Sequence, residues 1–132
     1  MAMNILVGYD DSKVAQDALE LAKKHAEKLG ARIHVVTSMA GGPEVPREAF
    51  EKAERRLDEA KTRVRKNDIA CEAHLSVRGL QPGEDLVQYA EENQIDQIVI
   101  GVRQRSKVGK LLFGSTAQYV ILEAPCPVVS VK

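Results

Sequence analysis

Apolar residues along this chain follow two alternating patterns. Short runs of Ile, Val and Leu without helical spacing are typical of buried strands, and longer segments with an apolar residue every three or four positions are typical of amphipathic helices. The predicted strands span residues 4–9, 33–37, 70–77, 95–100 and 127–131, and the predicted helices span residues 13–29, 46–66, 82–93 and 115–123. This strict alternation predicts a parallel sheet covered by helices on both faces.

Polar and glycine residues mark the ends of these elements. Asp10, Asp11 and Ser12 precede the first helix and compete for its N-cap, for which Ser12 is best placed. Gly30 is a typical residue for the end of that helix. The helix over residues 46–66 carries charges around most of its circumference, so we expect it to lie at the surface.

Ligands bind to doubly wound parallel sheets at the carboxyl ends of the strands, where the winding reverses. The loops after Tyr9, Thr37 and Ile100 are therefore the candidate ligand-binding segments. The third loop lies within residues 101–116, which contain four cations and no acid, and it enters the last helix through residues 114–116. The first N–H groups of a helix lack partners and carry the positive end of its dipole. This segment therefore predicts an anionic ligand.

Composition limits the classes of function. The chain has 132 residues, which predicts one domain over residues 1–132, and 19 basic residues balance 19 acidic ones. That balance provides no overall field for a nucleic acid or an anionic membrane. Apolar runs stay well short of the roughly 20 residues of a membrane span, and residues 1–4 lack the charged start of a signal peptide, so we expect a cytoplasmic protein. Cys71 and Cys126 are expected to be reduced packing residues.

Two common phosphate-binding patterns do not fit. Residues 109–116 nearly match the P-loop pattern, but Ser115 stands where that pattern needs a lysine. The first strand is not followed by G-x-G-x-x-G, so the dinucleotide fingerprint is missing as well. A Walker-type nucleotide hydrolase and a dinucleotide-binding site are both disfavoured.

The basic loop instead has a different glycine spacing. Gly101, two residues, Gln104, nine residues and Gly114-Ser115 resemble the G-x2-G-x9-G-[S/T] motif of nucleotide-binding universal stress proteins. The resemblance spans the whole chain and includes the ends of the first two strands and the proline-flanked last strand over residues 125–131. It implies a three-layer α/β/α sandwich of flavodoxin-like or Rossmann-like layout with a five-stranded parallel sheet, usually in a homodimer. Some members of that family bind ATP or AMP, and others bind neither.

Carried over position by position, the resemblance assigns roles in a nucleotide site. Asp10 would meet the adenosine, the backbone of Val35 would meet the adenine, and Gly101 would line the ribose. Residues 114–116 would hold phosphate, with Mg²⁺ alongside the phosphates and no metal ligand from protein side chains. The expected nucleotide-binding residues are Gly8, Tyr9, Asp10, Val35, Gly101, Arg103, Gln104, Arg105, Gly114, Ser115 and Thr116.

Gln104 departs from the family motif, in which a glycine lets the backbone approach the phosphates. A Cβ at that position costs roughly 1–2 kcal/mol if φ must be positive. The glutamine amide can instead donate a hydrogen bond to phosphate, and Arg103 and Arg105 can replace the missing backbone contact with charge. Both interpretations stay open on the sequence alone.

Other candidate site residues can also have a purely structural role in place of ligand binding. Asp10, Ser115 and Thr116 can be helix N-caps rather than ligand contacts. The four cations can simply keep their loop solvated. The three histidines, at positions 25, 34 and 74, have no metal-binding spacing and are expected to be structural.

These patterns favour a binding module over an enzyme. The sequence pairs no nucleophile with a base and has no P-loop lysine, so ATP hydrolysis would at most be slow. We expect an ATP- or AMP-binding sensor or regulatory module in a stress response. The alternative is a family member that binds no nucleotide and acts through protein contacts of the basic loop. The last strand should lie at a sheet edge, and the resemblance implies that two copies pair there.

Overall fold

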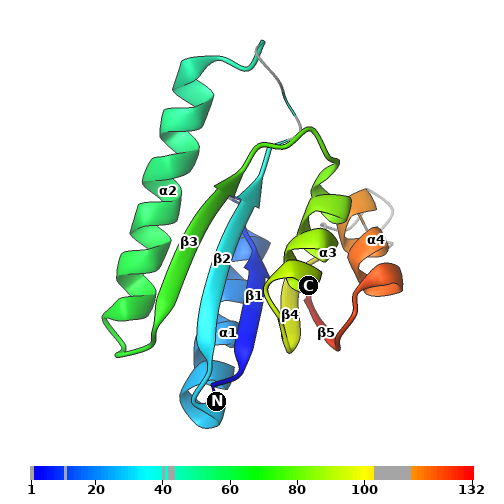
Figure 1. Cartoon of the computed structure of the whole chain (residues 1–132). Helices are drawn as coiled ribbons and strands as arrows, with labels where there is room; N and C mark the ends of the chain where they lie inside the picture. The colour runs from blue at the N-terminus through cyan, green and yellow to red at the C-terminus, as the bar shows by residue number, and fades with distance from the viewer. Residues whose placement is uncertain (1, 11, 40, 42–43, 103–113) are drawn as a thin grey trace.

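Strands and helices alternate along the whole chain in the computed structural model, which describes residues 2–10, 12–39, 41, 44–102 and 114–132 (Figure 1). In order they are β1 (Asn4–Gly8), α1 (Lys13–Leu29), β2 (Arg32–Ser38), α2 (Arg47–Arg65), β3 (Cys71–Ser76), α3 (Pro82–Glu92), β4 (Gln97–Gly101), α4 (Ser115–Glu123) and β5 (Val128–Val131). Every predicted element is present. The largest difference is at β4, which begins two residues later than the apolar run that predicts it.

The five strands form one sheet in the order β3-β2-β1-β4-β5, and every pair is parallel. The chain winds outward from β1 to β3, then returns to the other side of β1 for β4 and β5. The predicted five-stranded parallel sheet is confirmed. Its winding reverses between β1 and β4, and such a reversal opens a crevice at the carboxyl ends of these strands.

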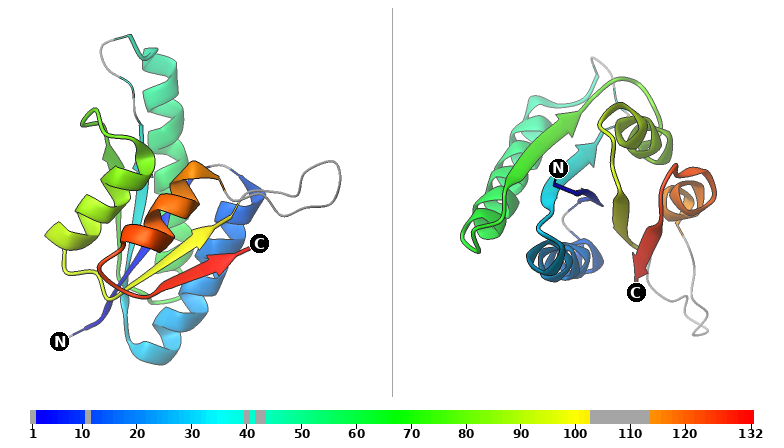
Figure 2. Two further views of the ribbon diagram at one scale, coloured as in Figure 1. Left: turned by 90° about the vertical axis from the view of Figure 1, so that its right-hand side faces the viewer. Right: turned by 60° about the horizontal axis from the view of Figure 1, so that its bottom comes forward.

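Two pairs of helices cover the two faces of the sheet, and Figure 2 shows them on opposite sides. Side chains alternate between the faces of a strand, so Ile5 and Val7 of β1 pack in the cluster formed with α1 and α2. Leu6, between them, packs in the cluster formed with α3 and α4. The predicted three-layer α/β/α sandwich is therefore confirmed.

The caps of α1 follow the expected chemistry. Ser12 Oγ accepts a hydrogen bond from the backbone N–H of Ala15 at 3.1 Å, so Ser12 is the N-cap. Gly30 ends the helix in a left-handed conformation with φ of 67°, which a glycine adopts without steric cost.

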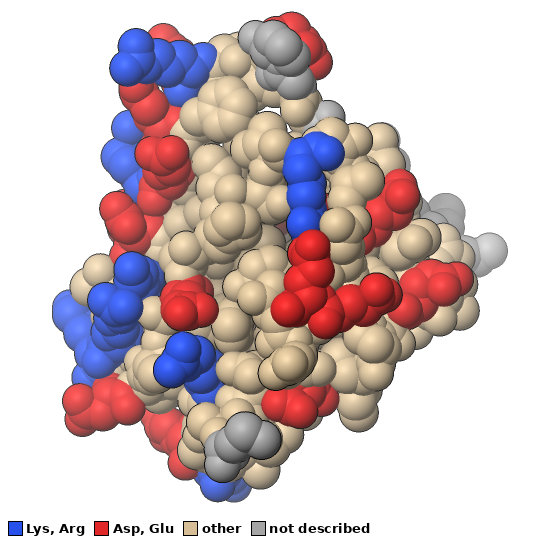
Figure 3. Space-filling model, in the orientation of Figure 1, with Lys and Arg blue, Asp and Glu red and all other residues tan. Residues whose placement is uncertain are grey.

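Helix α2 is mostly exposed, as expected from its charges. It buries only Leu57, Ala60 and Val64. Basic and acidic side chains alternate along the side of the molecule that α2 occupies (Figure 3). The free energy of holding this helix on the sheet therefore comes from one narrow apolar stripe.

The two cysteines are free thiols, as the sequence predicts. Cys71 is buried in the core below α2, and Cys126 is half-buried beside the start of β5. Burial raises the pKa of the Cys71 thiol to about 11. Both side chains serve as small packing residues.

His34 is a buried histidine that joins three elements. Its ring lies on β2, with Nδ1 2.8 Å from the hydroxyl of Tyr89 in α3 and Nε2 3.0 Å from Oδ1 of Asn4 in β1. Burial lowers the pKa of His34, although Glu72, 3.5 Å from Nδ1, acts in the opposite direction. The structural role expected for this histidine is confirmed.

We expect acid to weaken the fold through His34. Because its pKa is lower in the folded chain than in the unfolded chain, the unfolded chain binds the proton first as the pH falls below about 6.5. The free energy of unfolding should then fall, with a slope from this group of at most about 1.4 kcal/mol per pH unit. Urea denaturation of the wild type and of His34→Gln between pH 5 and pH 8 measures the difference in slope.

His74→Gln is the matched control, because His74 is exposed and its ring only lies against that of Tyr89. It leaves the hydrogen bonds of the His34 ring to Tyr89 and Asn4 in place, so the contribution of His34 to the slope should persist. An unchanged dependence in His34→Gln would contradict the assignment to His34.

Candidate functional site

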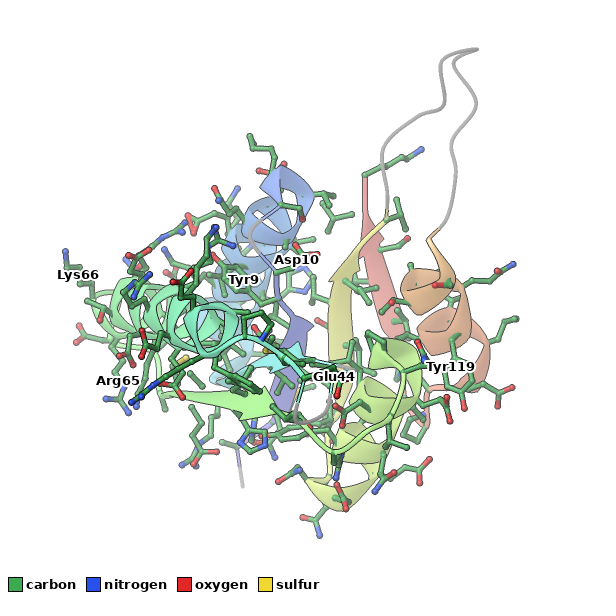
Figure 4. All side chains as sticks on the ribbon, turned by 90° about the horizontal axis from the view of Figure 1, so that it is seen from above. Tyr9, Asp10, Glu44, Arg65, Lys66 and Tyr119 are labelled. Atoms are coloured by element: carbon green, nitrogen blue, oxygen red, sulfur yellow. The ribbon has the colours of Figure 1, made fainter. Side chains whose placement is uncertain are left out.

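A cleft of about 510 Å³ opens at the carboxyl ends of β1, β2 and β4. Its position is the one that the reversal of winding predicts, and its volume falls within the range of about 300–1,000 Å³ common for small-molecule sites. Figure 4 looks down on this edge of the sheet, with Tyr9 and Asp10 near its centre. The lining residues are Gly8, Tyr9, Asp10, Ser12, Val14, Ala15, Val36, Thr37, Ser38, Pro82, Leu86, Ile100, Gly101, Gly114, Thr116 and Ala117.

Most of the residues expected in a nucleotide site meet in this cleft. Those that line it are Gly8, Tyr9, Asp10, Gly101, Gly114 and Thr116. Ser115 lies beside it, in a smaller hollow of about 220 Å³ shared with Thr116. Three further expected residues, Arg103, Gln104 and Arg105, lie outside the described residues, so their roles stay predictions.

Val35 lies elsewhere. Its side chain is fully buried in the core on the side of α1 and α2, and Val35 does not line the cleft, so the contact of its backbone with adenine stays a prediction. The strand continues to Ser38, one residue beyond its predicted end, and brings Val36, Thr37 and Ser38 to the cleft instead. Sequence reasoning placed a ligand loop after Thr37 but missed the two hydroxyl side chains at the end of the strand.

The N-terminus of α4 forms the end of the cleft nearest β4. Gly114 is the N-cap, with φ of −67° and ψ of 159°, and as a glycine it supplies no side-chain cap to the helix. Ser115 and Thr116 are therefore the first residues inside the helix. The alternative that either residue is only the helix N-cap is excluded. A helix N-terminus without a side-chain cap leaves N–H groups that an anion can satisfy.

Hydrogen bonds at the other end of the cleft leave acceptors facing it. Thr37 Oγ1 donates to the backbone carbonyl of Tyr9 at 2.8 Å, and Ser38 Oγ donates to Oδ2 of Asp85 at 2.5 Å. Each hydroxyl has a single proton, so both retain only acceptor capacity toward a ligand. Asp10 is also an acceptor, and its Oδ1 receives the backbone N–H of Ser12 at 2.8 Å.

Asp85 is a fully buried carboxylate that the sequence analysis did not identify. Besides Ser38, it accepts hydrogen bonds from Ser76 Oγ at 2.9 Å and from Nε of Arg78 at 2.6 Å. Burial acts to raise its pKa, but these three donors outweigh burial and hold the pKa below its usual value. Asp85 is thus ionised at neutral pH and can only accept hydrogen bonds.

The sequence carries little signal for this network. Asp85 lies in the first turn of α3, where an acidic residue is ordinary because it complements the helix dipole. Its partners come from the ends of β2 and β3 and from the loop after β3. Only the three-dimensional arrangement of these ends shows that the carboxylate is buried and shared.

The cleft therefore has two chemically different ends. Its β2 end offers acceptors from Thr37 and Ser38, and its α4 end offers N–H donors and a positive dipole. The described residues contain no group of three or more His, Cys, Asp or Glu side chains that could hold a metal ion. Such a cleft suits a ligand that has hydrogen-bond donors at one end and negative charge at the other.

Two glycines keep the floor of the cleft open. A Cβ on Gly8 would lie 2.9 Å from Cδ1 of Leu86, the end of a flexible side chain. A Cβ on Gly101 would lie 2.8 and 2.9 Å from the two methyl groups of Val14 and 3.0 Å from its carbonyl oxygen. Valine is stiff and the backbone cannot yield locally, so the second position tolerates a side chain less well.

We therefore expect Gly101→Ala to lower the free energy of unfolding by about 1–3 kcal/mol. Gly8→Ala should lower it by less than about 1.5 kcal/mol. Urea denaturation at neutral pH measures both. Equal effects would show that Val14 moves as readily as Leu86.

Comparison with known proteins agrees with the fold. The model of the universal stress protein family matches residues 1–132. A universal stress protein of Thermus aquaticus is 38% identical over 139 residues, covering all of both chains. Two solved universal stress proteins from Archaeoglobus fulgidus superpose on the chain. One is 40% identical with a TM-score of 0.91 and full coverage of both chains. The other, in complex with dAMP, is 33% identical with a TM-score of 0.84 and covers 100% of this chain and 98% of its own. The chain belongs to the universal stress protein family.

Proposed function

We propose that the chain binds an adenine nucleotide, AMP or ATP, in the cleft and acts as a sensor or regulatory module in a stress response. The observation that carries this proposal is the placement of a helix N-terminus with a glycine N-cap and an acceptor-lined strand end in one cleft. The Archaeoglobus fulgidus relative in complex with dAMP supports it. The alternative, protein contacts through the basic loop, concerns residues outside the described part of the chain.

The proposed nucleotide lies across the carboxyl edge of the sheet. Its phosphates meet the N-terminus of α4 at residues 114–116, because the glycine N-cap of this helix leaves room for them beside the first N–H groups. The ribose lies over Gly8 and Gly101, with its hydroxyls within reach of Asp10. The base extends toward Thr37 at the end of β2. One strand separates β2 from β4, so these ends lie about 10 Å apart.

In this proposal the protein binds rather than catalyses. The cleft contains one carboxylate, Asp10, and no histidine or cysteine among its described lining residues. If ATP is the ligand, we expect slow hydrolysis, since catalysis of phosphoryl transfer needs a positioned water and several charge contacts to the phosphates. A magnesium ion would be held through phosphate oxygens and water, which is its common mode of binding.

Gly114→Val should abolish nucleotide affinity while the fold persists. The valine side chain would occupy phosphate space at the start of α4, whereas the φ of −67° is accessible to any residue. We expect at least a hundredfold loss in ATP and AMP affinity, measured by isothermal titration calorimetry with and without magnesium. Mass spectrometry of ligand released from the denatured wild type identifies any nucleotide retained through purification.

Gln118→Val is the matched control, because it places the same side chain on an exposed position of α4 away from the cleft. It should bind nucleotide like the wild type. Equal affinity in Gly114→Val and the wild type would exclude the N-terminus of α4 as the phosphate site.

The edge of β5 supports a homodimer as a further part of the proposal. The carbonyl groups of Pro127 and Val131 accept hydrogen bonds of 3.0 and 2.7 Å from β4 and the residue after it. Backbone groups alternate between the two sides of a parallel strand, so those of Val128 and Ser130 point away from the sheet. These outward groups form an open edge at which a second copy can add its own β5.

Ser130→Pro should shift the protein from dimer to monomer, because it removes an outward N–H without removing a hydrogen bond to β4. Ser130→Ala keeps that N–H and should stay dimeric. Sedimentation velocity at high micromolar concentration distinguishes the two. A monomeric wild type would contradict the dimer and leave nucleotide binding untouched.

A further inference from the structure

The direction of one hydroxyl proton in the cleft is determined by a group outside the cleft. Asp85 is fully buried and does not line the cleft, whereas its partner Ser38 does. Three protein donors surround the Asp85 carboxylate: Ser38 Oγ on Oδ2, and Ser76 Oγ and Arg78 Nε on Oδ1. A carboxylate in such surroundings accepts from every neighbour. The proton of Ser38 therefore points at Asp85, away from the cleft.

A ligand consequently meets Ser38 as an acceptor only. A ligand group that donates a hydrogen bond can pair with the exposed lone pair of Oγ, whereas an acceptor there faces another acceptor. Thr37 repeats the arrangement beside it, because its proton is donated to the carbonyl of Tyr9. The end of β2 thus presents hydrogen-bond acceptors to the cleft.

Adenine carries a donor at this end and a 6-oxo purine carries an acceptor. In the proposed orientation the phosphates lie at α4 and the base extends toward β2. Ser38 is the last residue of β2 and faces the same side of the sheet as α3, which supplies Pro82 and Leu86 to the cleft. The exocyclic group on C6 of a purine lies far from the ribose, so in this orientation it is the group that extends toward Ser38.

We propose that Ser38, with its proton committed to Asp85, is a specificity-determining residue that selects a 6-amino purine over a 6-oxo purine. The inference rests on the proposed function, because it concerns the base of the same nucleotide. Asp85 acts as a positioning residue. It touches no ligand, and it decides which hydrogen bond Ser38 can make.

The test compares the affinities of AMP and IMP for the full chain by isothermal titration calorimetry. The wild type should bind AMP about tenfold or more tightly than IMP, since one hydrogen bond is gained and one unpaired acceptor is avoided. Purine riboside 5′-monophosphate, which has only hydrogen at the six-position, should fall between them. Ser38→Ala should weaken the affinity for AMP by up to about tenfold without weakening the affinity for IMP, and so abolish the preference.

Ser76→Ala is the matched control. It removes the other serine donor from Asp85, but Ser76 is buried and does not line the cleft. Any general weakening of the network should appear equally in both serine variants. The preference for AMP should persist in Ser76→Ala and disappear in Ser38→Ala, which separates recognition from stability.

Asp85→Asn should reverse the direction of the hydrogen bond between Ser38 and residue 85. Arg78 can only donate, so the amide oxygen must face Arg78 and the NH₂ group must face Ser38. Ser38 then accepts from the amide and turns its proton into the cleft. Binding should shift toward IMP by about tenfold relative to the wild type. If this variant does not fold, the comparison of the two serine variants still decides the question.

The outcomes separate the two proposals. Equal affinity of the wild type for AMP and IMP overturns the role of Ser38 and leaves nucleotide binding standing. A preference that survives Ser38→Ala, or that is lost equally in Ser76→Ala, also overturns it. Absence of binding by AMP, ATP and IMP overturns the proposed function and, with it, the inference.

Discussion

Parallel pairing brings the carboxyl ends of all five strands to one edge of the sheet, and each helix that follows a strand begins at that edge. The positive ends of four helix dipoles are therefore gathered there, and negative charge is stabilised near them. Asp85 in the first turn of α3 uses this field from inside the protein. An anion at the start of α4 would use it from the cleft. The topology thus determines where charge can bind before any individual side chain is considered.

The two ends of the cleft differ because their hydrogen bonds are satisfied in different ways. At β2 the hydroxyl protons are used within the protein, by the Tyr9 carbonyl and by Asp85, so lone pairs remain. At α4 glycine takes the N-cap position and supplies no side chain, so N–H groups remain. Helices α3 and α4 also approach each other closely at a glycine, because a Cβ on Gly83 would lie 2.8 Å from Cβ of Tyr119. Small residues there let α3 and α4 pack tightly beneath the site.

Local patterns predicted the elements well because each depends on neighbours in sequence. Apolar spacing located the nine elements, and the Ser12 cap followed from short-range hydrogen bonding. The residues at the end of β2 were harder to predict, since the strand runs one residue beyond its expected end and brings Ser38 to the cleft. Asp85 was beyond reach, because Ser38 stands 47 residues before it in sequence. The motif position Gln104 lies outside the described residues and stays a prediction.

Burial of Cys71 has a consequence for the reactivity of its sulfur atom toward oxidants. With a thiol pKa of about 11, only about one molecule in ten thousand carries the reactive thiolate at pH 7. Burial also raises the pKa of Cys126, the second of the two cysteines in the chain. Peroxides and disulfides attack the thiolate, so both sulfur atoms react slowly with oxidants. Burial thus keeps both cysteines in the less reactive thiol form.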